Sequence, residues 1–457
     1  MNYVMAQGIR YYMDTNHQNL IAQLLDAAQT AGADGADAML ARGQSNSISL
    51  RLGKVEASER SEDFDIGLRV FIGQRTASIS TSQLDPENIK NLAERAVAMA
   101  KLAPEDPYVR LATDAEIAKS IPDLDMFDET MPDSERLRER AARAEDAALS
   151  HKGIKTSDGA DAGHSIVDVL IGTSNGFLAG YKRSSHGVST VVIAEQDGHM
   201  ERDYDYSAAV YESDLQPAEE VGNNAASRTL ARLGAQKPKT GKFPVIYDRR
   251  VAASLVGTMA GAINGASISR GTSFLKDSLG KQVTSKGLCF VDDPLRSRGL
   301  GSRLFDGEGL AVQRRVMVDD GVLTGWFLDL ASAAKLEMTP TGNARRGLGS
   351  APSPGASNFY IENSTISRDA LIAEIDEGFL ITEMIGSSVD MITGDYSRGA
   401  GGFWISKGQI THPITEATIA GNLAEMFMQM TAANDIDLRD SVASPSLRLD
   451  SMMVAGS

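Results

Sequence analysis

The sequence predicts an α+β protein, in which N-terminal α/β-type domains with antiparallel sheets precede a larger β-rich C-terminal domain with packing helices. Apolar residues switch between helical spacing and strand-like alternation over the first half of the chain. Short strand-like runs punctuated by glycine dominate the second half. Because 457 residues exceed one ordinary domain, we expect three, over residues 1–130, 131–238 and 239–457.

The first domain begins with an amphipathic helix over residues 16–31, where apolar side chains keep helical spacing. Apolar and polar residues then alternate within 48–52 and 68–72, which predicts antiparallel strands, and a hairpin turn follows at 72–75. Asp85 followed by Pro86 favours the start of a second helix. Residues 103–133, rich in proline and acidic side chains, predict a long connection.

The middle domain starts with residues 134–150, whose dense Glu and Arg predict a solvated surface helix. A strand-rich region follows, with turn signals at Asn175-Gly176, His186-Gly187 and Asp197-Gly198. Their regular spacing predicts an antiparallel meander. A helix after Pro217 ends near residue 234, and the polar run after it gives the domain boundary.

The C-terminal domain opens with the strand 243–248, after which Asp248 caps a helix that Asn264-Gly265 stops. Several glycine-punctuated strands follow. We expect a last helix over 417–433, because apolar residues there follow one helical stripe. The stripe consists of Leu423, Met426, Phe427 and Met430.

Composition excludes several function classes. The net charge of −16 disfavours nucleic acid and anionic lipid as partners. The uncharged run 251–269 approaches membrane-spanning length, but Gly, Ser, Thr and Asn fill about half of it. Cys289 is the only cysteine, so we expect a cytosolic protein without an intrachain disulfide or a multi-thiolate metal site. The first twenty residues show no signal peptide.

No catalytic constellation is visible among the residues. The G-x-S-x-G pattern at 172–176 reads as a hairpin turn rather than a nucleophile elbow, because strand-like residues follow it. The six histidines share no ligand spacing, so we expect each at the surface or in a turn.

Two segments are candidates for binding a peptide. Arg345 and Arg346 can meet a carboxylate or a peptide carbonyl, or can form a structural salt bridge. Gly394, Asp395 and Arg398 belong to a turn and bulged strand that suits either strand addition of a peptide or a tight sheet corner.

Longer stretches carry a family resemblance. They are "TSFLKDSLGKQV" (272–283), "MTPTGNARRG" (338–347), "MITGDYSRGAGGFWISKGQI" (391–410) and "HPITEATIAGNL" (412–423). In this order they resemble the TldD/PmbA family, and specifically its PmbA (TldE) branch. The N-terminal run "DIGLRVFIGQRTASIST" (65–81) resembles the first domain of the same family.

The resemblance implies a cytosolic two-subunit metallopeptidase that processes unfolded or leader peptides. In its TldD-type subunit, a His-Glu-x-x-x-His helix and a downstream cysteine hold zinc. Those helix positions fall near Val256, Gly257 and Gly261, and no shift of register helps, since 251–269 contains neither His nor Glu. Cysteine is also missing near the C-terminus. The resemblance therefore implies a non-catalytic chain without a cofactor of its own, with zinc in a TldD-type partner and a peptide as substrate.

Two alternatives stay open at this stage. The chain is either an active peptidase with an unrecognised site, working as a homodimer, or a regulatory binding protein acting on a topoisomerase. Zinc content of the isolated chain, cleavage without a partner, and recovery of a topoisomerase separate these alternatives.

Overall fold

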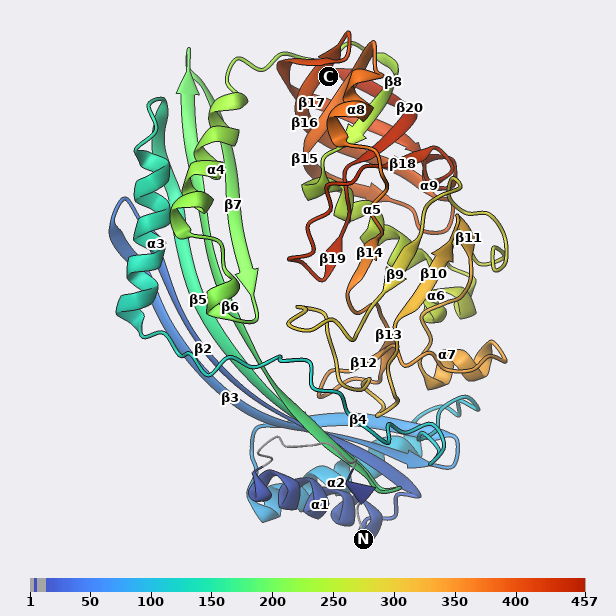
Figure 1. The fold of residues 1–457 in the computed structure, drawn as a ribbon. Helices are drawn as coiled ribbons and strands as arrows, with labels where there is room; N and C mark the ends of the chain where they lie inside the picture. Colours follow the sequence, from blue (N-terminus) through green and yellow to red (C-terminus); the bar gives the residue numbers. More distant parts are fainter. Residues whose placement is uncertain (1–3, 6–13, 457) are drawn as a thin grey trace.

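The computed structural model describes residues 4–5 and 14–456, so the expectation about the first twenty residues lies largely outside the described part. Figure 1 shows a long curved sheet beside a C-terminal body, with the two chain ends at opposite ends of the molecule. Among the described residues, no helix combines the length and apolar character that crossing a membrane requires.

The curved sheet contains seven strands within the described residues, in the order β1-β6-β5-β2-β3-β4, with β7 on the free side of β6. The strands are β1 (Val4–Met5), β2 (Gly35–Arg51), β3 (Lys54–Ile72), β4 (Arg75–Thr81), β5 (Ile154–Thr173), β6 (Phe177–Gln196) and β7 (His199–Ala209). All neighbours are antiparallel except β1 and β6. Strands β2 and β5 pair from Asp37 opposite Thr173 to Leu50 opposite Ala160. The sheet therefore continues across the predicted boundary at residue 130, and the boundary itself stays a prediction.

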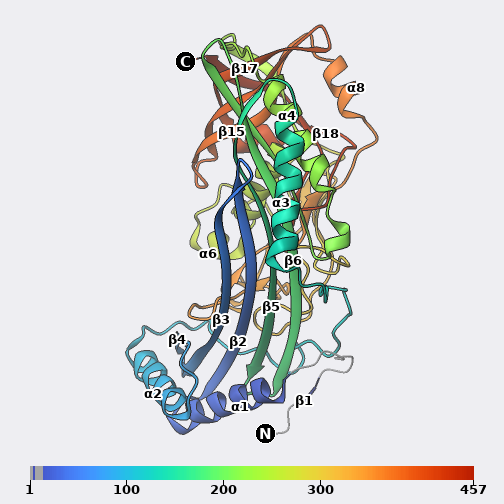
Figure 2. The same ribbon diagram turned by 90° about the vertical axis from the view of Figure 1, so that its left-hand side faces the viewer.

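Four helices cover one face of this sheet in the described chain (Figure 2). They are α1 (Thr15–Thr30), α2 (Pro86–Leu102), α3 (Ser134–Leu149) and α4 (Ala218–Ala231). Because successive side chains of a strand point to opposite faces of the sheet, even- and odd-numbered residues of β2 contact different partners. On β2, the even-numbered Ala38 and Leu40 pack under α1 and α2, and the even-numbered Ile48 and Leu50 pack under α3. The odd-numbered Met39 instead packs with residues 304–310 of the C-terminal body.

Two predictions for this half need correction. Helix α3 is solvated on its outer face only, because its inner face is buried between the sheet and α4, where Leu137 and Ala141 are fully covered. His186-Gly187 is not a turn but lies within β6. The turns at Asn175-Gly176 and Asp197-Gly198 are confirmed, and the short 3₁₀ turn η1 (Glu212–Asp214) links β7 to α4.

In the C-terminal body, β8 (Gly241–Tyr247), β15 (Glu377–Val389), β16 (Asp395–Ser406), β17 (Gln409–Asn422) and β20 (Leu447–Gly456) form a ring. The pairing of β17 with β20 closes this ring into a barrel, and β18 (Met430–Ala432) adds to β20. A second sheet has the order β11-β10-β9-β14-β19. Its strands are β9 (Phe290–Asp292), β10 (Arg315–Asp319), β11 (Val322–Leu323), β14 (Phe359–Ile361) and β19 (Val442–Ala443).

Short elements complete this body and support the antiparallel, β-rich fold class that the sequence predicts. They are α5 (Arg249–Ala262), α6 (Gly265–Arg270), α7 (Leu330–Lys335), β12 (Ala344–Arg345), β13 (Ser353–Pro354), α8 (Arg368–Ala373) and α9 (Leu423–Phe427). Asn264 does end α5, but it also caps α6 by accepting from the backbone N–H groups of Ala266 and Ser267.

The predicted helix over 417–433 is wrong. Residues up to Asn422 belong to β17, and only Leu423–Phe427 are helical. The helical stripe is nevertheless buried, since Leu423, Met426 and Phe427 lie on α9 and Met430 on β18, all in one core. Residues 417–422 pair with β16 instead, because tertiary pairing overrides a local helical pattern.

Candidate functional site

Helix α5 lies at the centre of the C-terminal body. The Asp248 carboxylate accepts from the backbone N–H of Arg250, 3.1 Å away, and so caps the helix as predicted. One face is buried between the barrel and the second sheet. That face consists of Ala252, Leu255, Val256, Met259 and Ala262. Gly257 and Gly261 lie on the opposite, exposed face.

The three positions at which the family resemblance places metal ligands cannot bind zinc in this chain. Val256 is fully buried and apolar, and Gly257 and Gly261 have no side chain. Zinc sites need imidazole, thiolate or carboxylate donors. Within residues 4–5 and 14–456, no three His, Cys, Asp or Glu side chains are grouped so that they could hold a metal ion.

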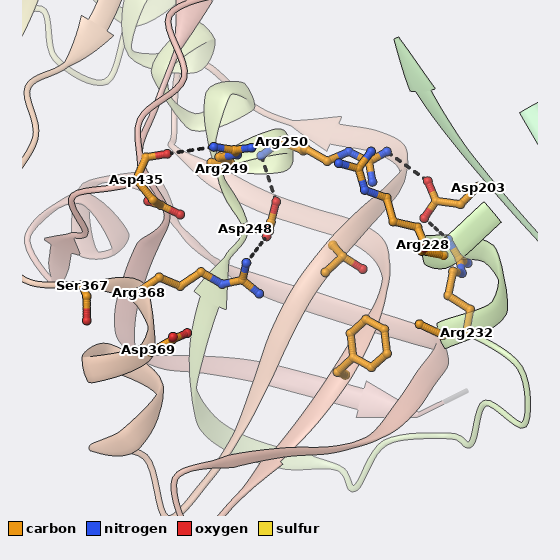
Figure 3. Close-up of a pocket in the computed structure, with 14 residues that line it drawn as sticks. Asp203, Arg228, Arg232, Asp248, Arg249, Arg250, Ser367, Arg368, Asp369 and Asp435 are labelled. Atoms are coloured by element: carbon orange, nitrogen blue, oxygen red, sulfur yellow. Dashed lines mark hydrogen bonds and ion pairs between the residues drawn. The ribbon is translucent and has the colours of Figure 1, made fainter. Parts of the chain in front are cut away.

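A cavity of about 530 Å³ opens at the N-terminus of α5, between this helix, α4 and the barrel (Figure 3). Five arginines and four aspartates line it. The arginines are Arg228, Arg232, Arg249, Arg250 and Arg368, and the aspartates are Asp203, Asp248, Asp369 and Asp435. Such a wall is polar but nearly balanced in charge.

The arginines of this cavity are held by carboxylates. Arg250 lies 3.0 Å from Asp203, and Arg368 lies 3.2 Å from Asp248, the cap of α5. Arg250 also stacks over the ring of Tyr204, 4.6 Å from its centre. Because these cations are already neutralised, the cavity suits a polar, uncharged group such as a peptide backbone better than a free anion.

A smaller cavity shares Arg228, Arg249 and Arg250 with the first. Tyr204 and Tyr206 of β7 line one side of it, and β19 lines the other. Both strands end their sheets, since β7 pairs only with β6 and β19 only with β14 among the described strands.

The predicted arginine pair separates into two roles. The side chain of Arg346 is 1% exposed and lies 2.6 Å from Asp37 on β2, which matches the structural salt bridge considered for it. Asp37 also accepts from Arg69 at 2.9 Å. Burial alone would raise the pKa of Asp37, but Arg346 and Arg69 hold it below its usual value. Arg345 is exposed and donates to the carbonyl oxygen of Ala356 at 3.0 Å.

The second predicted group lies elsewhere, at the start of β16. Gly394 adopts a positive φ of 82°, Asp395 accepts from the Thr393 hydroxyl at 2.9 Å, and Arg398 donates to the Gly386 carbonyl at 2.8 Å. Among the described residues, no hydrogen bond or ion pair joins this group to Arg345 or Arg346.

Strand β16 cannot accept a peptide by strand addition along its length. It pairs with β15 on one side from Tyr396 to Ser406, and with β17 on the other side from Asp395 to Ser406. Strand addition requires an open edge of a sheet. Any peptide contact of Gly394, Asp395 or Arg398 would therefore use the turn or the side chains.

Sequence reasoning missed a buried histidine pair. His164 on β5 lies directly opposite His186 on β6, and their ring centres are 4.7 Å apart. Both are buried, and the imidazole of His186 lies 3.2 Å from Asp128. The signal was available only through strand register, because 22 residues separate the two in sequence and pairing follows the hairpin at 173–177.

Comparison with known proteins bears on the whole chain. Residues 36–100, 127–233 and 240–456 match domain 1, the central domain and the C-terminal domain of the family described as PmbA/TldA metallopeptidase. Metalloprotease PmbA of Escherichia coli O157:H7 is 39% identical over 426 residues, which is 93% of each chain.

Solved structures agree in fold. A Bacteroides thetaiotaomicron protein described as a modulator of DNA gyrase has a TM-score of 0.90 at 26% identity, covering 98% of this chain and 100% of its own. TldE from Thermococcus kodakarensis has a TM-score of 0.81 at 20% identity, covering 96% and 100%. The chain therefore belongs to the PmbA/TldD metallopeptidase family, on its PmbA (TldE) branch.

Proposed function

We propose that this chain is the non-catalytic subunit of a cytosolic TldD-type metallopeptidase and takes part in processing unfolded or leader peptides. One observation carries the proposal. Helix α5, at the position where the family resemblance places the zinc helix, presents a buried valine and two glycines instead of ligands. In this proposal the zinc ion, which would activate water for peptide hydrolysis, is held by the TldD-type partner.

The exposed face of α5 supports a role in association. A Cβ atom at Gly257 would meet no other atom within 4 Å, and one at Gly261 would meet only the side chain of Met391, at 3.5 Å. Two glycines four residues apart leave the helix backbone open on one face. A partner chain or a peptide can therefore approach this backbone closely.

The cavities beside α5 support peptide binding. Strand β19 ends the second sheet and lines the smaller cavity, so its edge, rather than β16, is the place for strand addition. The larger cavity, with its paired arginines, then continues the path along the N-terminus of α5. Arg345, Arg346, Gly394, Asp395 and Arg398 remain predicted peptide contacts; Arg346, being buried, would act by positioning its loop.

Co-expression with a TldD-type subunit from the same genome tests the proposal. We expect a stable complex by native mass measurement, with zinc in the complex and not in the purified chain alone. Cleavage of unfolded peptides should need both subunits and stop with a chelator. Stoichiometric zinc in the isolated chain, or chelator-sensitive cleavage by a homodimer of it, would overturn the non-catalytic role.

A matched pair of variants locates the contact. Gly257→Arg adds a long charged side chain to the exposed face of α5, and we expect it to weaken the complex or the cleavage. Ala98→Arg makes the same kind of change at an exposed position of α2 and serves as the control. Equal effects of the two substitutions would contradict a special role of the α5 face.

A second candidate function is regulation of a topoisomerase. The observation that favours it is the description of a Bacteroides thetaiotaomicron relative, 26% identical, as a modulator of DNA gyrase. The net charge of −16 favours contact with protein rather than with DNA. Affinity capture that recovers gyrase but no TldD-type chain would support this function over the first.

A further inference from the structure

A second large cavity lies on the other face of the curved sheet, away from the helices. It has a volume of about 390 Å³, within the range of small-ligand sites. The odd-numbered residues of β2, β5 and β6 form its floor, and segments 300–307 and 344–346 form its roof. The floor is partly apolar, with Met39, Val169 and Ile171.

Four arginines line this cavity. Arg346 is paired with Asp37, whereas the other three come from distant parts of the chain: Arg183 on β6, Arg303 in the roof, and Arg345 on β12. Within the described residues, none of the three forms an ion pair with a carboxylate closer than 4 Å. This distinguishes them from the arginines around α5, which have acidic partners.

The three guanidinium groups donate to backbone carbonyls instead. Arg183 bonds the Gly299 oxygen at 2.9 Å. Arg303 and Arg345 converge on one acceptor, the carbonyl oxygen of Ala356, at 2.7 and 3.0 Å. Two cations that share one neutral acceptor repel each other, and a bound anion would relieve that repulsion.

Asp306, the acidic group in the wall, offsets only part of this charge. Asp306 already accepts from the backbone N–H groups of Glu308 and Leu310, each at 2.9 Å, and from that of Ala344 at 3.1 Å. Burial raises the pKa of Asp306 to about 6. Burial, together with the neighbouring Arg345, lowers the pKa values of Arg183 and Arg303, and for Arg303 these effects outweigh the opposing effects of Asp292 and Asp306.

We propose that the cavity formed by Arg183, Arg303 and Arg345 binds a carboxylate of a peptide, at its C-terminus or on an acidic side chain. This assignment rests on the proposed function for the choice of a peptide. The apolar floor beside the cations fits an organic anion with an apolar body better than a bare inorganic one. Arg345 is exposed, so the cavity reaches solvent at that residue.

The test is calorimetric titration of the isolated full-length chain with acetylated tetrapeptides at low salt. Four peptides are compared: each has either a free C-terminal carboxylate or a C-terminal amide, and either Glu or Gln at an internal position. They separate binding of the C-terminal carboxylate from binding of an acidic side chain. We expect at least one acidic form to bind at least tenfold more tightly than the uncharged amide, with affinity falling as salt rises. Equal affinity of all four peptides would overturn the proposal, and so would inorganic phosphate that binds more tightly than the acidic peptides.

Variants separate binding from folding. Arg345→Gln and Arg183→Gln should each weaken acidic-peptide binding about tenfold or more, whereas Arg345→Lys should recover part of it. Arg315→Gln is the control, because Arg315 also bonds a backbone carbonyl, that of Thr341 at 3.1 Å, but does not line the cavity. Thermal unfolding must show that each variant folds. If Arg183→Gln does not fold, the comparison of Arg345→Gln with Arg345→Lys, at the exposed position, decides whether the cavity binds the carboxylate.

This experiment uses no partner subunit, so its failure is distinct from failure of the proposed function. If the chain binds the carboxylate but forms no complex with a TldD-type subunit, the carboxylate site is supported and the proposed subunit role is overturned. If the chain forms the complex but does not bind the carboxylate, the subunit role is supported and the carboxylate site is overturned.

Discussion

His164 and His186 face each other across β5 and β6, with no more than 8% of either residue exposed. Arg136 and Arg140 of α3 and Asp128 of the connecting segment surround them. Burial, His164 and these arginines together lower the pKa of His186 to about 4, against the opposing effect of Asp128. The protein thus keeps an uncharged imidazole pair under α3 at neutral pH.

This pair predicts acid-sensitive stability. The pKa of His186 is lower in the folded chain than its ordinary value of 6.5, so the unfolded chain binds more protons between about pH 6.5 and 4. The free energy of unfolding therefore falls as pH drops through this window, by on the order of 3 kcal/mol from His186. Denaturant unfolding at several pH values measures it. His186→Gln should flatten the dependence, whereas His199→Gln, at an exposed position, should leave it unchanged; equal slopes for all three proteins would refute the prediction.

The buried carboxylate of Asp37 should be costly to remove. It pairs with Arg346 at 2.6 Å and with Arg69 at 2.5 Å, so Asp37→Asn leaves two buried cations without their main partner. We expect a loss of about 3–5 kcal/mol in the free energy of unfolding, measured by urea titration. Glu62→Gln removes an exposed partner of Arg60 and should cost less than about 1 kcal/mol. A loss below that level for Asp37→Asn would contradict the argument.

Two helical glycines should respond oppositely to alanine. Gly257→Ala places a methyl group in open space and should stabilise the chain by about 0.5–1 kcal/mol, because alanine favours helix. At Gly222 on α4, a Cβ would lie 2.1 Å from the Ala144 carbonyl oxygen of α3, so Gly222→Ala should cost about 1–3 kcal/mol. Thermal unfolding compares them; a change of the same sign at both positions would show that the packing of α4 on α3 is looser than described.

The cap of α5 allows a finer test. Asp248→Ala removes the acceptor for the backbone N–H of Arg250 and the partner of Arg368, so we expect a loss of about 1–2 kcal/mol. Asp248→Asn keeps a capping oxygen and should lose less. If both variants lose the same stability, the ion pair with Arg368, and not the cap, is the main contribution of Asp248.

Local signals made the helices of the N-terminal half predictable. Asp85 with Pro86 marks the start of α2, and the structure confirms that the Asp85 side chain accepts from the backbone of Asn88. Long strands were harder to predict. Strand β3 runs from Lys54 to Ile72, through ten consecutive residues that are mostly polar and exposed, because one end of the sheet stands in solvent.

Of the candidate sites, one could also be predicted from the sequence and one could not. The missing ligands on α5 are visible in sequence, since Val256 and Gly257 carry no donor atom. The arginine cavity is not visible, because Arg183, Arg303 and Arg345 are joined only by packing the sheet against the C-terminal body. Arg345 was a candidate from its neighbours in sequence, and its two partners were not.

Because β2 pairs with β5, which is far along the chain, β2 must wait for its neighbour during synthesis. Leu50 pairs with Ala160, 110 positions later in the chain, and Asp37 pairs with Thr173, 136 positions later. At roughly 5–20 residues per second, β2 leaves the ribosome many seconds before its neighbour exists. During that interval the hairpin of β2 and β3 has an unpaired edge of fourteen residues, from Asp37 to Leu50, open to other nascent strands. Polar residues such as Gln44, Ser45 and Asn46 in the middle of β2 reduce the tendency of this edge to aggregate while it waits.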